Sequence, residues 1–361
     1  MTDTSIEPSA DAPAQLSTLD RFLPVWIGAA MLIGIVLGKA IPDLDETLDA
    51  IKIDTVSLPI AIGLLAMMYP VLAKVKYTRI GESLDRRSLV MSLVLNWLIG
   101  PALMFALAWI LLPDLPEYRT GLIIVGLARC IAMVLIWNDL ACGSRELAAV
   151  LVAINSLFQI VAYSILGYFY LELLPEWLGL DSDGIDVTMW EIAKSVLIFL
   201  GIPLLAGFLT RTIGERAKGV EWYEERFLPR IGPVALYGLL FTIVILFALQ
   251  GEQITEQPWD VARIAVPLLI YFALMWFGSY FAGLKMGFPY ERNTSIAFTA
   301  AGNNFELAIA VSIGVFGVTS GQALAGVVGP LIEVPVLVAL VYVSLWAKRR
   351  YYDTDGVRPR S

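Results

Sequence analysis

Residues 126–139 read GLARCIAMVLIWND and place an arginine and one of only two cysteines within a run otherwise apolar enough for a lipid bilayer. A charged side chain at the centre of a membrane-spanning helix costs on the order of 3 kcal/mol on insertion scales. Arg129 and Cys130 therefore indicate a helix whose middle faces protein or a cavity instead of lipid.

The rest of the chain is equally apolar. Of its 361 residues, 58% are hydrophobic and 16% are charged, whereas a soluble domain carries about 25% charged residues. A spanning helix needs roughly 20 mostly apolar residues. Segments of this kind lie near 23–41, 56–73, 89–112, 120–141, 147–174, 190–210, 231–250, 262–284, 293–315 and 322–347. The sequence thus predicts an all-α polytopic membrane protein with ten transmembrane helices.

The distribution of positive charge predicts the orientation. If ten helices cross the membrane, 19 of the 25 Lys and Arg residues lie in segments on one side and four on the other. Basic loops stay in the cytoplasm, so we expect a multi-pass protein of the plasma (inner) membrane with both termini cytoplasmic. Residues 1–21 are expected to form a disordered cytoplasmic tail, and residues 348–361 a cytoplasmic C-terminal tail. The run 22–41 is long enough to be a retained helix instead of a cleaved signal.

Five helices per half is an odd number, so homologous halves would be inverted relative to each other. Residues 157–171, LFQIVAYSILGYFYL, align with residues 331–345, LIEVPVLVALVYVSL, at an offset of 174, which sets Gln159 opposite Glu333. We therefore expect a first repeat at 22–174 and a second, inverted repeat at 189–347.

The same offset places Cys130 on Asn304, within AAGNNFELA at residues 300–308. Cys130 and Glu306 lie 11 and 14 residues beyond the basic residues Arg119 and Arg292. At about 1.5 Å per residue, both fall near the midplane of a core roughly 30 Å thick. Interrupted helices that meet at the midplane of two repeats are typical of a transporter's binding site.

Two interpretations of this polar centre remain open at the level of sequence. Arg129 could form an ion pair with Glu306 or bind backbone carbonyls, and either contact would only lock the bundle. Cys130 could be a small buried hydrophobe, or its neighbouring cation could favour the thiolate, which is the metal-binding form. Cys142 lies 12 residues further on, roughly 18 Å along a helix, so it joins Cys130 in neither a disulfide nor a ligand set.

Other polar residues have weaker patterns. Asn155 and Gln159 share one helix face, which fits either the wall of a cavity or hydrogen bonds between helices. The possible supporting residues are Asn96, Asn138, Asn155, Ser156, Gln159 and Glu333. Pro101, Pro203, Pro233 and Pro267 mark either kinks or sites of helix packing.

Several functions are excluded by composition. The chain has no histidine and no phosphate-binding loop of the GxxxxGK[ST] type, so it is neither an HExxH zinc protease, nor a Ser-His-Asp hydrolase, nor an ATP-driven pump on its own. We expect a transporter driven by an ion gradient and not an enzyme, with no cofactor and no nucleic-acid partner. The oligomeric state is not predicted.

Residues 126–143, GLARCIAMVLIWNDLACG, and residues 299–317, TAAGNNFELAIAVSIGVFG, closely resemble the Acr3 arsenite efflux permeases of the bile acid/arsenite/riboflavin transporter superfamily. The resemblance implies a core domain and a panel domain built from inverted repeats, with the broken fourth and ninth helices crossing in the core. The cysteine and glutamate on which that family relies fall on Cys130 and Glu306.

The resemblance implies a secondary transporter that extrudes arsenite, As(OH)3, in exchange for protons, with antimonite as a further candidate cargo. Arsenic is a soft centre that prefers sulfur, so Cys130 would be its ligand. Glu306 would exchange the proton, because a carboxylate near the midplane favours its neutral form unless a cation compensates. Asn303, Asn304 and Arg129 would bond the hydroxyl groups.

Two other functions are weighed against this one. Sodium-coupled organic-anion symporters of the bile-acid type carry an acid several residues before a Gln-Asn pair in the ninth helix, where this chain has Thr299. That difference removes a hard oxygen ligand for sodium. A membrane-embedded receptor or assembly subunit would use the polar midplane only for packing.

Overall fold

The structure is a computed structural model that describes residues 22–41, 44, 52–53, 56–76, 85–180, 187–256, 258–353 and 356. Residues 1–21, which are expected to form the N-terminal tail, lie outside this part. So do residues 354–355 and 357–361 of the expected C-terminal tail, residues 348–361. Within the described part, all long elements are helices, and the strands β1 (Lys52–Ile53) and β2 (Val56–Ser57) form one short antiparallel pair. The expected all-helical class is confirmed.

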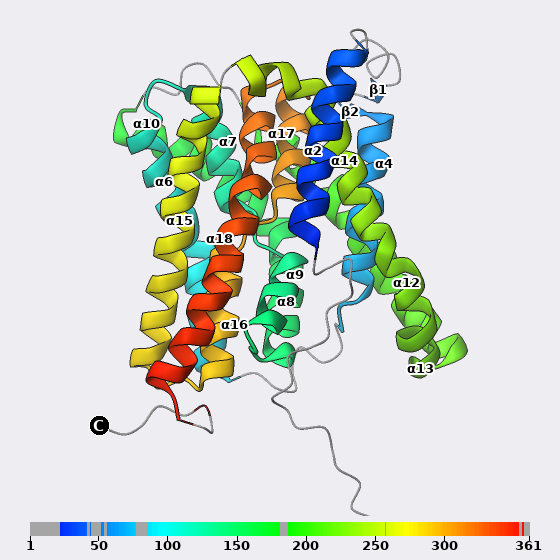
Figure 1. Ribbon diagram of the computed structural model, residues 1–361, viewed down its shortest axis with the longest axis vertical. Coiled ribbons are helices and arrows are strands. Elements are labelled where there is room, and N and C mark those ends of the chain that lie inside the picture. The colour runs from blue at the N-terminus through cyan, green and yellow to red at the C-terminus, as the bar shows by residue number, and fades with distance from the viewer. Residues whose placement is uncertain are drawn as a thin grey trace, which may run out of the picture.

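The helices follow one another along the whole chain (Figure 1). They are α2 (Leu23–Ala40), α4 (Leu58–Ala73), α5 (Arg86–Val94), α6 (Gly100–Leu111), α7 (Pro116–Leu127), α8 (Met133–Leu140), α9 (Arg145–Tyr168), α10 (Leu174–Leu178), α11 (Met189–Val196), α12 (Ile202–Lys218), α13 (Val220–Trp222), α14 (Leu228–Glu256), α15 (Pro258–Lys285), α16 (Tyr290–Ala301), α17 (Phe305–Phe316) and α18 (Gly321–Tyr351). Four π-helical segments join some of them: η2 (Leu95–Ile99), η3 (Phe169–Leu173), η4 (Leu197–Gly201) and η5 (Tyr223–Phe227).

Among the residues that the structure describes, six continuous helical stretches are long and apolar enough to cross a membrane. They run over Arg86–Leu111, Arg145–Leu178, Met189–Lys218, Val220–Gly251, Pro258–Lys285 and Gly321–Tyr351, and the shorter apolar helices are Val25–Ala40, Leu58–Ala73 and Phe305–Phe316. The chain is therefore an integral membrane protein. The segments expected near 120–141 and 293–315 are each divided into two helices, α7 with α8 and α16 with α17.

Proline explains the π-helical segments. Each of them is followed, two residues after its end, by a proline: Pro101, Pro175, Pro203 and Pro229. Proline has no amide hydrogen, and its ring clashes with the carbonyl four residues earlier, so the preceding turn widens. In the first case the amide of Gly100 donates to the carbonyl oxygen of Leu95, five residues back. Pro233 and Pro267 instead lie inside the uninterrupted helices α14 and α15.

The helices pack in two groups. α14 packs against α2 and α4, and α12 also packs against α4, which places these four helices together on the right in Figure 1. In the other group, α7 packs on α6 and α18, α15 packs on α16 and α18, and α17 packs on α18. The two interrupted helices both belong to this second group, so the centre of the molecule is built around them.

Glycine spacing brings α2 close to α14. Gly34 and Gly38 are four residues apart, a spacing that lets two backbones approach in a membrane. A Cβ on Gly34 would lie 2.6 Å from the carbonyl oxygen of Val244, and one on Gly38 would collide with the carbonyl of Ala248. Backbone atoms, which cannot move aside, form this contact.

Gly38→Val is expected to separate α2 from α14 and to destabilise the protein by about 1–3 kcal/mol, the usual cost of overpacking. Gly28→Val is the matched control on the same helix, because no atom lies within 4 Å of a Cβ built there. Thermal melting in detergent measures the difference. Equal melting temperatures for the two variants would contradict the close α2–α14 contact.

Candidate functional site

The interruptions of two helices face each other. α7 ends at Leu127 and α16 at Ala301, where Ala128 and Gly302 adopt extended conformations. Residues Arg129 and Asn303 then pair as an antiparallel β-bridge. The amide of Cys130 donates to the carbonyl oxygen of Gly302 (3.3 Å), and the amide of Asn304 donates to that of Ala128 (3.1 Å). The two backbone breaks thus satisfy each other, and we call residues 128–130 with 302–304 the junction.

Two side chains complete the junction from neighbouring helices. The amide of Arg129 donates to Oε1 of Gln159 in α9 (2.8 Å), and the amide of Asn303 donates to Oε1 of Glu333 in α18 (3.1 Å). Both acceptors are fully buried. Gln159 therefore makes a hydrogen bond between helices, which is one of the two roles that its helix face allowed.

The offset of 174 relates these bonds in pairs. Arg129 and Asn303 differ by 174 positions, as do their acceptors Gln159 and Glu333. The same offset relates the two backbone bonds of the bridge, because residues 128 and 130 correspond to residues 302 and 304. The bond from Cys130 to Gly302 therefore corresponds to the bond from Asn304 to Ala128. Each half of the junction therefore makes the same set of contacts.

Arg129 is fully buried but lies away from the thiol that follows it. Its Nη1 donates to the hydroxyl of Tyr271 in α15 (2.8 Å), and its Nη2 donates to the carbonyl oxygen of Gly126. No ion pair between Arg129 and Glu306 is present among the described residues. Of the two structural alternatives, binding to a backbone carbonyl is therefore the one observed. Tyr271 has no distinguishing spacing in the sequence, so its contact could not have been predicted.

The side-chain hydrogen bonds of Arg129 go to Tyr271 and Gly126, and the activation of Cys130 as a thiolate stays one of the two open interpretations. Successive side chains of an extended segment point to opposite sides, so the guanidinium and the thiol diverge.

Cys130 is tightly enclosed, with 3% of its surface exposed. A Cβ built on Gly302 would lie 3.0 Å from the Cβ of Cys130, so only glycine lets the two segments approach this closely. Cys142 is half-buried at the turn after α8, in the left-handed region at a φ of 54°. The two thiols therefore occupy separate places, as their spacing predicted.

The two asparagines hold the ends of the junction. Nδ2 of Asn303 donates to the carbonyl oxygens of Val125 (2.7 Å) and Ala128 (3.3 Å). Oδ1 of Asn304 accepts from the amide of Leu307 (3.0 Å) and so caps the first turn of α17. The atoms Oδ1 of Asn303, Nδ2 of Asn304 and Oε2 of Glu333 have no partner in the described part of the chain, which makes them available to hydroxyl groups.

A cavity of about 210 Å³ reaches Glu306 from between the two groups of helices. Its walls come from α4, from α14 and from the start of α8, and they include Met67, Val71, Lys74, Met133, Leu236 and Glu306. Glu306 is half-buried in the first turn of α17. Arg129, Cys130, Asn303 and Asn304 are not on the cavity wall, because Ala132 and Met133 lie there instead. Of the expected binding residues, the cavity therefore touches Glu306 alone.

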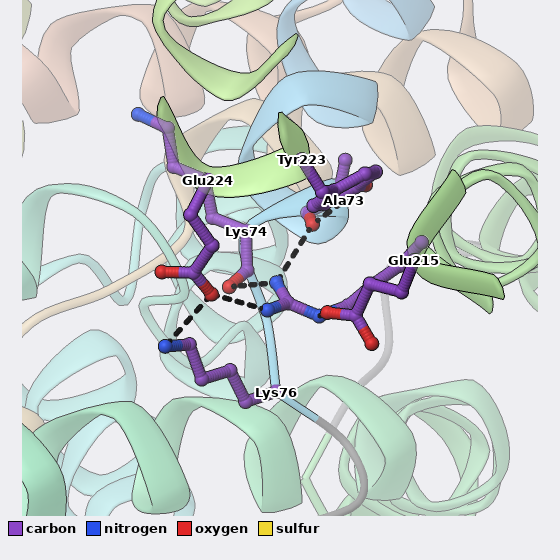
Figure 2. Close-up of polar contacts among 7 residues, drawn as sticks. Ala73, Lys74, Lys76, Glu215, Tyr223 and Glu224 are labelled. Carbon is purple, nitrogen blue, oxygen red and sulfur yellow. Dashed lines mark hydrogen bonds and ion pairs between the residues drawn. The ribbon is translucent and has the colours of Figure 1, made fainter. Parts of the chain in front are cut away.

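Arg211 of α12 bonds the backbone at Lys74, which lines the cavity, and Figure 2 labels the residues around this contact. Its Nη1 donates to the carbonyl oxygens of Ala73 (3.4 Å) and Lys74 (3.1 Å), at the end of α4. The hydroxyl of Tyr223 also donates to Ala73 (3.2 Å). The terminal carbonyls of a helix need such partners, so these contacts fix the backbone at Lys74, which lines the cavity.

Acidic residues hold Arg211 in place. Glu224 accepts from Arg211 (2.6 Å) and pairs with Lys76 (2.7 Å), while Glu215 pairs with Nε of Arg211 (2.8 Å). The cluster ties α4, α12 and η5 together. Neither Lys74 nor Arg211 was singled out from the sequence, because each looks like an ordinary basic residue of a loop or helix end.

The remaining candidate residues make structural bonds. Nδ2 of Asn96 donates to the carbonyl of Ser92 (2.8 Å), and Oδ1 of Asn138 accepts from Ser295 (2.7 Å). Oδ1 of Asn155 accepts from Nε1 of Trp97 (3.3 Å). Ser156 donates to the carbonyl of Val152 (2.7 Å), and none of the four candidates is among the residues that line the cavity.

Glu333→Gln is expected to leave the junction intact, because the neutral amide of Gln159 makes the equivalent bond in the other half. Glu333→Ala removes the acceptor of a buried amide, which costs about 1–3 kcal/mol. Thermal melting of the two variants measures the difference, with Gln159→Ala as the matched variant. An alanine variant as stable as the parent would contradict the bracing role of Glu333.

Comparison with known proteins identifies a family and several proteins that are similar to this chain. The sodium bile acid symporter family matches residues 61–257. The chain is 58% identical over 350 residues to the arsenical-resistance protein Acr3 of Corynebacterium glutamicum, and the aligned region covers 97% of this chain and 95% of that protein. It is 37% identical to an uncharacterized transporter of Synechocystis (98% and 97% covered). It is 34% identical to the arsenical-resistance protein Acr3 of Alkaliphilus metalliredigens (90% and 92% covered).

Proposed function

Because the chain belongs to the sodium bile acid symporter family, among its Acr3 arsenical-resistance proteins, we propose that it is a secondary active transporter that extrudes arsenite from the cytoplasm in exchange for protons. Membership makes the chain a membrane transporter of the arsenical-resistance type. We propose in addition that the cargo is arsenite, that a proton is exchanged for it, and that transport is outward. Antimonite, which has similar chemistry, is a second candidate cargo.

The observation that carries the proposal is that one thiol lies in the junction and one carboxylate lies just beyond it. Cys130 bonds Gly302 across the junction, and Glu306 follows Gly302 by four residues, in the first turn of α17. Sulfur is the ligand that arsenic prefers, and a single thiol holds As(OH)3 weakly enough for a carrier to release it. Glu306 faces the cavity and is placed to exchange a proton as the cargo binds.

The polar atoms of the junction suit the hydroxyl groups of As(OH)3. Oδ1 of Asn303 and Nδ2 of Asn304 lack partners among the described residues, and they offer one acceptor and one donor beside Cys130. Arg129 is assigned a positioning role, since its guanidinium binds Tyr271 and Gly126. The cargo reaches the thiol when the wall formed by Ala132 and Met133 moves, a step that alternating access would supply.

The distribution of charge supports the direction. Lys74 lies at the rim of the cavity and belongs to the segment with several basic residues that the positive-inside rule places in the cytoplasm. The cavity then opens toward the cytoplasm, from which arsenite is to be removed. Both termini lie on that side in this topology, with residues 1–21 and 348–361 as cytoplasmic tails.

We also propose ten membrane spans in two inverted repeats, residues 22–174 and 189–347. α7 and α16 each have 12 residues and begin 174 positions apart, and the ends of α6 and α15, at Leu111 and Lys285, differ by the same number. The group of α2, α4, α12 and α14 then forms the panel domain, and the interrupted helices belong to the core. The paired bonds of the junction support this symmetry.

The alternative is a sodium-coupled organic-anion symporter, because the matching family is named after sodium bile acid symporters. Sodium-coupled symporters of the bile-acid type carry an acid several residues before a Gln-Asn pair in the ninth helix. At that place this chain has Thr299, whose hydroxyl donates to the carbonyl of Ser295 (2.7 Å). A hydroxyl already engaged within its own helix is a poor substitute for a carboxylate ligand, so protons are favoured over sodium.

Cys130→Ser is expected to lower arsenite uptake into everted vesicles by about tenfold or more, because the soft sulfur ligand becomes a hard oxygen. The uptake is driven by an imposed proton gradient and normalised to the amount of folded protein. Cys142→Ser, the matched control, should transport like the parent, since Cys142 lies at a turn away from the junction.

Two outcomes would overturn parts of this function. Equal uptake by all three proteins would show that Cys130 only packs, and would remove arsenite binding from the junction. Uptake by the parent that requires sodium, and stops when potassium replaces it, would favour the symporter alternative. Arsenite uptake that follows the proton gradient with either cation supports the proposal.

A further inference from the structure

A long groove lies on the outside of the bundle, away from the junction. It has a volume of about 730 Å³ and runs between the start of the helix formed by α5 and η2 and the end of α15. Its apolar walls include Val90, Val94, Leu95, Ile99, Ala282 and Met286. At one end the wall is polar and consists of Asp85, Arg86 and Arg87.

The apolar part of the groove faces the bilayer. Val90 is 50% exposed, Val94 41%, Ile99 43% and Met286 45%, although they belong to helices apolar enough to span a membrane. Val90 and Val94 are four residues apart, as are Leu95 and Ile99, so each pair shares one face of the helix and both pairs line the groove. In a membrane, an acyl chain is the partner that these apolar walls contact.

The polar end carries an excess of positive charge. Arg86 and Arg87 are exposed, and neither forms an ion pair within the described ranges. Asp85, the neighbouring acid, is already engaged, because it accepts from the amide of Arg87 (3.3 Å) and the hydroxyl of Ser88 (3.1 Å). It also lies 3.8 Å from Nη1 of Arg292. Three arginines thus face a single carboxylate at the start of a helix, where the dipole also favours an anion.

We propose that this groove binds an anionic phospholipid, whose phosphate contacts Arg86 and Arg87 and whose acyl chain lies along Val90, Val94 and Ile99. A free phosphate would leave the apolar walls unused, and a zwitterionic lipid would bring its own cation toward the arginines. Basic pockets at helix ends on the cytoplasmic side are suited to anionic headgroups. The site depends on the membrane-embedded fold and not on which substrate is transported.

The test is native mass spectrometry of the purified full chain, titrated with phosphatidylglycerol or with phosphatidylcholine of the same acyl chains. The parent is expected to retain phosphatidylglycerol preferentially. Arg86→Gln/Arg87→Gln should bind it about 30-fold more weakly, because each arginine near an anionic surface contributes about 1 kcal/mol. The matched control, Arg349→Gln/Arg350→Gln, removes two exposed charges at the end of α18 and should bind like the parent.

A second variant tests the apolar part without changing charge. Val94→Trp fills the groove at an exposed position, so it should weaken binding of phosphatidylglycerol while leaving the melting temperature of the lipid-free protein unchanged. Equal affinity for the two lipids in the parent would overturn the proposal. It would also fail if the control variant lost as much binding as the groove variant, or if Val94→Trp bound like the parent, since the first indicates a non-specific charge effect and the second an unused groove.

Discussion

A break in a helix within a lipid bilayer exposes amide and carbonyl groups that the hydrocarbon cannot bond, and each unsatisfied group costs several kcal/mol. The protein contains two such breaks and places them against each other. The bridge between Arg129 and Asn303 satisfies one set of backbone groups. The amides of Arg129 and Asn303 themselves donate hydrogen bonds to Gln159 and Glu333. Neither break could exist without the other.

This constraint also creates the chemistry of the centre. Breaking two helices produces two new helix starts, those of α8 and α17, inside the protein. Cys130 lies three residues before the first, and Glu306 occupies the first turn of the second. A helix start carries a partial positive charge from its free amides, so a soft ligand and an acid are held in a polar setting that the surrounding helices otherwise lack. The apolar helices α4 and α14 then close a cavity over Glu306.

Much of this centre could be predicted from the sequence because it depends on residues that a spanning helix cannot normally tolerate. Arg129, the asparagine pair and Glu306 mark both breaks, and the offset that aligned Gln159 with Glu333 identified the two residues that make equivalent bonds. The direction of a side chain after a break was not predictable. Arg129 and Cys130 are adjacent, yet the guanidinium bonds Tyr271 and Gly126 while Cys130 packs against Gly302. The cavity rim was also missed, because Lys74 and Arg211 become neighbours only when α4 packs on α12.

The central claim is that the sulfur of Cys130 at the junction is the ligand of arsenic. X-ray absorption spectroscopy at the arsenic edge tests it directly, on the purified protein saturated with arsenite, in the parent and in Cys130→Ser. We expect one sulfur neighbour of arsenic in the parent and only oxygen neighbours in the variant. Oxygen neighbours alone in the parent, or an unchanged sulfur signal in the variant, would contradict the claim.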